Sequence, residues 1–139
     1  MNDRIKPVIL IIEDEGLLAR MYSKKLEIDG YDVVSASNGE EGIKLAVEKK
    51  PDIILCDVMM PVMDGISVLK KLKADDTTKS IPVIMLSNLA EDKYIDESLE
   101  IGAVSYLVKS KLVPADVVAK IKETLEATGK KSLLSNTNS

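Results

Sequence analysis

Carboxylates follow two of the most apolar segments of this sequence, at the point where each segment ends. Val8–Ile12 leads directly into Glu13 and Asp14, and the apolar segment that begins at Pro51 ends in Asp57. Clustered carboxylates repel one another, so one of them should titrate at an unusually high pH unless a cation neutralises the cluster. A few hard oxygen ligands with room for water suit Mg²⁺. The acids therefore predict a Mg²⁺ site, provided that the fold brings them together.

A hydroxyl and an ammonium group follow two further apolar segments. Pro82–Leu86 is followed by Ser87, and Val104–Val108 is followed by Lys109. If the four segments are parallel strands, all these side chains meet at one edge of the sheet, where ligands bind in open α/β folds. A hydroxyl and an ammonium beside a metal supply hydrogen-bond donors and positive charge for phosphoryl oxygens. The expected chemistry is a phosphoryl group on or near a carboxylate, with Mg²⁺.

The segments that must position these residues predict an α/β fold. Apolar runs of about five residues alternate with segments of 3.6-residue periodicity, which is typical of a parallel sheet covered by helices. Five such units predict a five-stranded parallel sheet in the order 2-1-3-4-5, a doubly wound, flavodoxin-like sandwich of three layers. The strands are expected at 8–12, 32–36, 51–57, 82–86 and 104–108, with later helices at about 38–49, 67–74 and 91–101.

The first and last helices are predicted from their apolar stripes. The stripe of the first helix is expected to consist of Leu17, Leu18, Met21, Tyr22, Leu26 and Ile28. The last helix is expected to begin at Pro114, a residue favoured in the first helical turn, and to end near Gly129. It should bury Val117, Val118, Ile121 and Leu125.

Length and composition limit the possible functions. With 139 residues, one domain is expected over residues 1–128, followed by a short polar tail at 129–139 and no output domain. The net charge of -4 and the lack of a basic stripe argue against a nucleic-acid partner. The absence of histidine means that the chain cannot itself donate a phosphoryl group from a phosphohistidine.

The expected location is the cytoplasm, with no membrane partner. No apolar run approaches the roughly 18 residues that span a bilayer, and the polar N-terminus is unlike a signal peptide. The single cysteine, Cys56, fits a reducing compartment and is expected to be a small core residue.

Taken in order, these motifs resemble the receiver domains of two-component response regulators, especially the stand-alone CheY-like ones. The resemblance rests on Glu13-Asp14, on Asp57 with the following Met60–Gly65, on Ser87, and on Lys109 with Tyr106 ahead of it. It extends over about residues 5 to 128. It implies a single-domain response regulator that takes a phosphoryl group from a sensor histidine kinase or a histidine phosphotransfer protein. It implies no enzyme activity beyond this transfer and a slow autodephosphorylation.

The resemblance also assigns roles to individual residues. By this likeness, Asp57 is the phosphoacceptor, and Mg²⁺ is bound by Asp14, Asp57 and the backbone carbonyl of Met59, with Glu13 acting mostly through water. Lys109 and Ser87 would bind the phosphoryl oxygens. Tyr106 would change rotamer, and a downstream protein would bind the face formed by the helix at 91–101, the strand at 104–108 and the last helix.

Two positions differ from the family pattern, and two more are expected to modulate the site. Asn88 replaces the usual small residue after the hydroxyl, so it would crowd the pocket or add a donor. Ser110 replaces the usual proline after Lys109, where a cis bond would cost about 3–4 kcal/mol. Met59 and Leu89 flank the expected path of the attacking water and are predicted to exclude it.

Other interpretations of these residues remain open at this point. Glu15 is interpreted as a helix N-terminal acid, favoured by the helix dipole, and Ser87 could cap the following helix. The alternative function is an interaction module that keeps the fold without phosphorylation. A phosphatase with an aspartyl-phosphate would need a second Asp at position 59, which is a methionine, and a flavodoxin-like cofactor binder would need a Gly-rich loop after the first strand.

Overall fold

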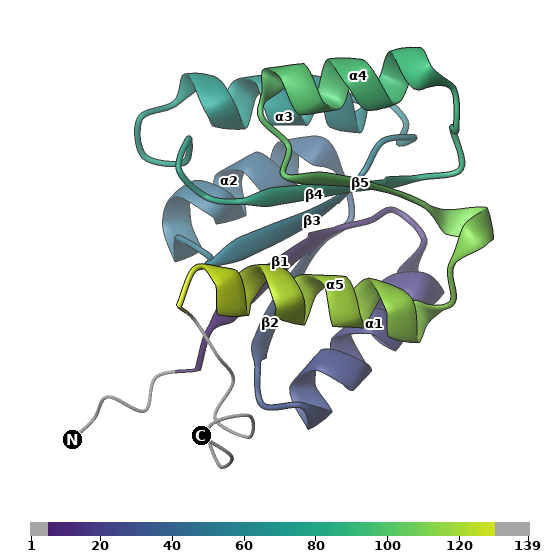
Figure 1. Ribbon diagram of the computed structural model, residues 1–139. Helices are drawn as coiled ribbons and strands as arrows, with labels where there is room; N and C mark the ends of the chain where they lie inside the picture. The colour runs from purple at the N-terminus through teal and green to yellow at the C-terminus, as the bar shows by residue number, and fades with distance from the viewer. Residues whose placement is uncertain (1–5, 130–139) are drawn as a thin grey trace.

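A computed structural model describes residues 6–129 as one parallel five-stranded sheet with helices on both faces (Figure 1). The strand order is β2-β1-β3-β4-β5, as predicted. The strands are β1 (Val8–Ile12), β2 (Asp32–Ala36), β3 (Ile53–Asp57), β4 (Val83–Ser87) and β5 (Ser105–Val108). All four strand pairs are parallel.

The five α-helices form the outer two layers. They are α1 (Gly16–Ile28), α2 (Gly39–Lys49), α3 (Gly65–Ala74), α4 (Asp92–Ile101) and α5 (Pro114–Ala127), and a single 3₁₀ turn, Lys109–Lys111, follows β5. Helices α1 and α5 cover one face of the sheet, and α2, α3 and α4 cover the other (Figure 1). Because both faces are covered, the central strands are buried on both sides, as in other all-parallel sheets.

The side chains of β1 divide between the two halves of the core. Ile9 and Ile11 pack with α1 and α5, whereas Leu10 and Ile12 pack with α2 and α3. This alternation follows from the two-residue period of a strand. Cys56 on β3 is completely buried in the same way, so the prediction of a small core residue is confirmed.

Register places the functional residues at one edge of the sheet. Ile12 pairs with Cys56, so Glu13 follows β1 beside Asp57 at the end of β3. Asp57 pairs with Leu86, and Ser87 pairs with Val108, the residue before Lys109. The parallel arrangement therefore brings the four strand ends together, as the sequence predicted.

The predicted stripe of α1 is wrong in half of its members. Leu17, Met21 and Ile28 are exposed, at 68%, 41% and 73%, and the buried residues are Ala19, Tyr22 and Leu26. At 100° per residue these two sets lie on opposite sides of the helix. Both stripes have helical spacing, and only the position of the sheet decides which one is buried.

The other elements differ from expectation mainly at their ends. Helix α3 begins at Gly65 because Asp64 caps it, with its side chain accepting a hydrogen bond from the Ser67 amide at 2.9 Å. Ser87 belongs to β4 and does not cap α4, whose N-cap residue is Glu91. Helix α5 begins at Pro114 and buries the four predicted residues. The predicted tail lies outside the described residues except for Gly129.

Within residues 6–129, no helix is long and apolar enough to cross a bilayer.

Candidate functional site

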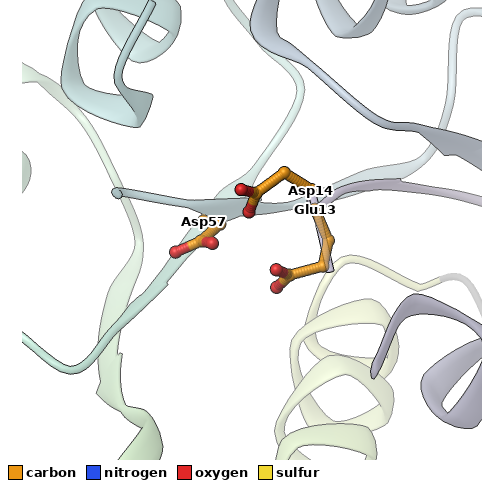
Figure 2. Close-up of side chains that lie close together, drawn as sticks. All are labelled: Glu13, Asp14 and Asp57. Carbon is orange, nitrogen blue, oxygen red and sulfur yellow. The ribbon is translucent and has the colours of Figure 1, made fainter. Parts of the chain in front are cut away.

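Three carboxylates meet where β1 and β3 end (Figure 2). Glu13, Asp14 and Asp57 each offer a carboxylate oxygen, and these atoms lie within 4.8 Å of one another. Asp57 is only 3% exposed and Glu13 is equally buried, whereas Asp14 is open to solvent. The cluster therefore has two buried members and one on the solvent side, from which a cation could enter.

Burial and mutual repulsion disturb the titration of the buried pair. Loss of solvent and, to a smaller degree, the neighbouring charge of Asp57 together raise the pKa of Glu13 to about 7. Burial also raises the pKa of Asp57, although the Lys109 ammonium opposes this change. Two buried carboxylates that resist ionisation together are a favourable setting for a divalent cation.

Among the described residues, Lys109 supplies the positive charge next to the carboxylate cluster. Its Nζ lies 3.3 Å from Asp57 Oδ2, 3.3 Å from Glu13 Oε1 and 3.6 Å from Glu15 Oε1. Burial would lower the pKa of Lys109, but the carboxylates of Asp57 and Glu13 outweigh it and the pKa is raised. The ammonium is therefore held in its charged form. The Lys109–Ser110 peptide bond is trans, as are all peptide bonds within the described residues.

The loop after β3 fixes the position of the Asp57 carboxylate. Asp57 Oδ1 accepts a hydrogen bond from the Met59 amide at 3.2 Å, and the Gly65 amide donates to the Val58 carbonyl at 2.8 Å. A Cβ at Gly65 would overlap the backbone carbonyl of Asp57, so only glycine permits this close return of the loop. The metal-binding role of the Met59 carbonyl stays a prediction.

Ser87 and Tyr106 converge on the backbone of Leu89. Ser87 is fully buried, and its Oγ accepts a hydrogen bond from the Leu89 amide at 3.0 Å. The Tyr106 hydroxyl donates to the Leu89 carbonyl at 2.7 Å. Asn88, which lies between Ser87 and Leu89 in the chain, is exposed, and the Leu89 side chain is half-buried. Ser87 and Tyr106 are thus linked through the backbone amide and carbonyl of one residue, Leu89.

Met59 and Leu89 share a mainly apolar cavity of about 430 Å³ beside the site. Its lining comes from the loop after β3, from α3, from the loop after β4 and from α4: Val58, Met59, Met60, Pro61, Asp64, Ile66, Leu89 and Tyr94. Of the two methionines in this lining, Met59 is exposed and Met60 is buried. Met59 and Leu89, which were predicted to modulate the site, thus line one cavity.

One contact of the site was not predicted. Glu15 was interpreted as a helix N-terminal acid, but its carboxylate reaches Lys109 from the rim of the site. Its position next to Glu13 and Asp14 was the available signal. Nothing in the sequence indicates that its side chain turns toward a residue 94 positions later.

Comparison with known proteins identifies the family. The family model of the response regulator receiver domain matches residues 9–122. The chain belongs to this family. Receiver domains interact with histidine kinases and downstream effectors and generally bind Mg²⁺ at an acidic pocket, which here corresponds to the cluster of Glu13, Asp14 and Asp57.

Curated relatives with this receiver domain are transcriptional regulators. The phosphate regulon transcriptional regulatory protein PhoB of Pseudomonas aeruginosa is 38% identical over 121 residues, covering 87% of this chain and 52% of the relative. The DNA-binding dual master transcriptional regulator RpaA of a Synechocystis species is 38% identical over 125 residues, covering 88% and 50%. The chain thus spans about half the length of these relatives. RpaA is described as DNA-binding and PhoB as a transcriptional regulatory protein, which conflicts with the expectation that nucleic acid is not a partner.

Solved receiver domains share the fold over nearly their whole length. A CheY-like receiver domain protein of Methanospirillum hungatei superposes with a TM-score of 0.82 at 28% identity, covering 88% of this chain and 96% of that one. The chemotaxis protein CheY4 of Vibrio cholerae gives 0.79 at 28% identity, covering 86% and 98%. These likenesses confirm the CheY-like, flavodoxin-like fold predicted from the sequence.

Proposed function

We propose that this receiver domain accepts a phosphoryl group on Asp57 from a phosphohistidine of a sensor histidine kinase or a phosphotransfer protein. The observation that carries the proposal is the setting of Asp57. Its carboxylate ends a buried strand, lies 3.3 Å from the Lys109 ammonium, and belongs to a three-carboxylate cluster. A rigid carboxylate next to a cation and a potential metal site is suited to in-line phosphoryl transfer.

The transfer uses a carboxylate oxygen of Asp57 as the nucleophile. As its bond to phosphorus forms, the bond from phosphorus to the partner's imidazole nitrogen breaks, and the electron pair leaves with the imidazole, which takes up a proton. The Lys109 ammonium offsets charge on the phosphoryl oxygens, and the Ser87 hydroxyl can donate to one of them while it still accepts from the Leu89 amide.

The donor set fits Mg²⁺ as the cation of this site. Asp14 and Asp57 offer carboxylate oxygens from adjacent strand ends, and buried Glu13 can act through water. Few protein ligands and space on the open side of Asp14 suit a cation that keeps several waters. When bound, Mg²⁺ would supply positive charge against the phosphoryl oxygens.

Phosphorylation is proposed to change a partner-binding face formed by α4, β5 and α5. The support is the backbone of Leu89, whose amide is hydrogen-bonded to Ser87 at the end of β4 and whose carbonyl is hydrogen-bonded to Tyr106 on β5. The receiver domain acts in the cytoplasm as a phosphorylation-dependent relay or switch for a downstream protein. It is not an enzyme beyond its own phosphoryl transfer and slow autodephosphorylation.

Incubation with Mg²⁺ and acetyl phosphate, followed by intact mass spectrometry, tests the proposal. The protein should gain one phosphate, and only when Mg²⁺ is present. Asp57→Asn should gain none, while Asp64→Asn, which changes a nearby carboxylate that caps α3, should still be phosphorylated. A phosphorylated Asp57→Asn protein would show that the acceptor lies elsewhere.

A further inference from the structure

Glu15 lies at the open rim of the site, with its carboxylate directed at Lys109. Its Oε1 is 3.6 Å from Lys109 Nζ, and its side chain is 65% exposed. Glu15 is the N-cap residue of α1, yet its side chain makes no capping hydrogen bond. The carboxylate therefore does not serve the start of the helix in the usual way, and its contact with Lys109 calls for another role.

Lys109 is shared between the inside of the site and its rim. Inside, Asp57 and Glu13 are both buried and both lie 3.3 Å from Nζ. At the rim, Glu15 is the third carboxylate within reach. A phosphoryl group on Asp57 would add anionic oxygens on the inner side only. Glu15 then competes with the phosphoryl group for the N–H donors of one ammonium.

We propose that Glu15 is a positioning residue that holds Lys109 toward the rim while Asp57 carries no phosphoryl group, and thereby slows phosphoryl transfer. This inference rests on the proposed function of Asp57. Glu15 acts through Lys109 and does not itself contact the reacting atoms. Without the Glu15 charge, the ammonium is held only by its inner partners, closer to the place where the phosphoryl oxygens arrive.

The test compares Glu15→Gln with the parent in Mg²⁺ and acetyl phosphate, following the phosphorylated fraction by intact mass. The initial rate should rise about two- to fivefold, the range that the loss of one exposed ion pair can account for. Glu91→Gln is the matched control. Glu91 is the exposed N-cap residue of α4, also without a side-chain capping bond, and within residues 6–129 it forms no ion pair with Lys109. Its rate should equal that of the parent.

Two further measurements separate positioning from a general charge effect. In a Lys109→Ala background, the Glu15→Gln substitution should change the rate by less than a factor of about 1.5, because its partner is gone. With phosphoramidate, which carries less negative charge than acetyl phosphate, the factor should be the same. An equal gain in the Lys109→Ala background, a gain in Glu91→Gln, or a gain confined to acetyl phosphate would overturn the proposal.

The same experiment distinguishes this inference from the function on which it rests. A parent protein that takes up no phosphate contradicts the proposed function and the role of Glu15 together. A parent that is phosphorylated on Asp57, at a rate that Glu15→Gln leaves unchanged, contradicts the role of Glu15 alone.

Discussion

Asp57 lies in a site with more carboxylates than cations. Glu13 and Asp14 lie beside it, and Glu15 contacts Lys109. Among the described residues, Lys109 is the one ammonium in contact with the cluster. The site without a metal therefore stores repulsion, which the protein relieves partly by keeping a proton on its buried carboxyls. Because of this imbalance, the stability of the metal-free protein should depend on pH.

Because of Glu13, the free energy of unfolding of the metal-free protein should decrease as pH rises from about 4.5 to about 7. The pKa of Glu13 is raised from 4.5 to about 7 in the folded state, so between these values the folded state binds more protons than the unfolded state. Asp57→Asn removes a charge that raises this pKa, so the variant should be more stable than the parent by about 1–2 kcal/mol at pH 8. At pH 4.5 the two should be closely similar.

Urea unfolding in a chelator at these two pH values measures this difference. Asp14→Ala, which removes the exposed member of the cluster, should stabilise the metal-free protein less than Asp57→Asn does. A constant difference between Asp57→Asn and the parent at both pH values would show that repulsion with Glu13 is not its cause.

Met59 and Leu89 should make autodephosphorylation slow, on a scale of minutes to hours. Both line the apolar cavity at the loop after β3, and neither side chain can hydrogen-bond and orient an attacking water. Met59→Asn and Leu89→Glu should each speed the loss of phosphate about tenfold, because they supply groups that hold a water in line. The measurement is the decay of phosphorylated protein after the donor is removed.

Asn88 is the natural competitor for this role, since its exposed amide follows Ser87 directly. Decay of the parent within seconds, abolished by Asn88→Ala, would mean that Asn88 positions the water. Unchanged decay in both the Met59 and Leu89 variants would show that these two side chains do not control it.

At the scale of elements, the backbone of Leu89 connects the end of β4 with Tyr106 on β5. Its amide donates to Ser87 and its carbonyl accepts from Tyr106, so movement of Ser87 toward a phosphoryl group would be felt by both strands. The helix that follows is weakly anchored, because Ser98 is its one buried residue. The hydroxyl of Ser98 has no hydrogen-bond partner within the described residues. A shift of the loop could therefore be passed on to α4.

Addition of beryllium fluoride as a phosphoryl mimic, with Mg²⁺, should change amide chemical shifts over residues 90–99 and 104–112. The reason is that α4 follows Leu89 in the chain and β5 contains Tyr106, which is hydrogen-bonded to the Leu89 carbonyl. In Tyr106→Phe, which cannot donate to Leu89, the changes over 90–99 should be reduced. Changes limited to the loops after β1 and β3 would contradict transmission to this face.

At the scale of the whole molecule, Mg²⁺ should stabilise the fold, because the cluster forms only when β1 and β3 pair. At a concentration ten times the dissociation constant, stabilisation of about 1.4 kcal/mol is expected, which raises Tm by roughly 4 °C. Asp14→Ala should abolish the shift. The shift should also be smaller at pH 6 than at pH 8, because the cation must displace protons from Glu13 and Asp57.

Differential scanning calorimetry with and without Mg²⁺ measures this effect. The same measurement with Ca²⁺ shows whether the site prefers the smaller cation. An equal rise of Tm in Asp14→Ala would assign the stabilisation to a site other than the cluster.

Much of this protein follows from local features of its sequence. The apolar runs, the helical periods between them and the acids at their ends predicted the strand order, the four buried residues of α5, and the convergence of Asp57, Glu13, Asp14 and Lys109. These predictions succeed because parallel strands with helical connections allow few arrangements, and each places the strand ends at one edge of the sheet.

The tertiary structure decided what depends on contacts between distant residues. Helix α1 has two apolar stripes of the same period, and only packing against the sheet buries Ala19, Tyr22 and Leu26 while leaving Leu17 exposed. Glu15 reaches Lys109, and Ser87 bonds to Leu89 in place of capping α4. In each case the local sequence allows more than one partner, and the choice is made by distances of a few ångströms that only the packed molecule defines.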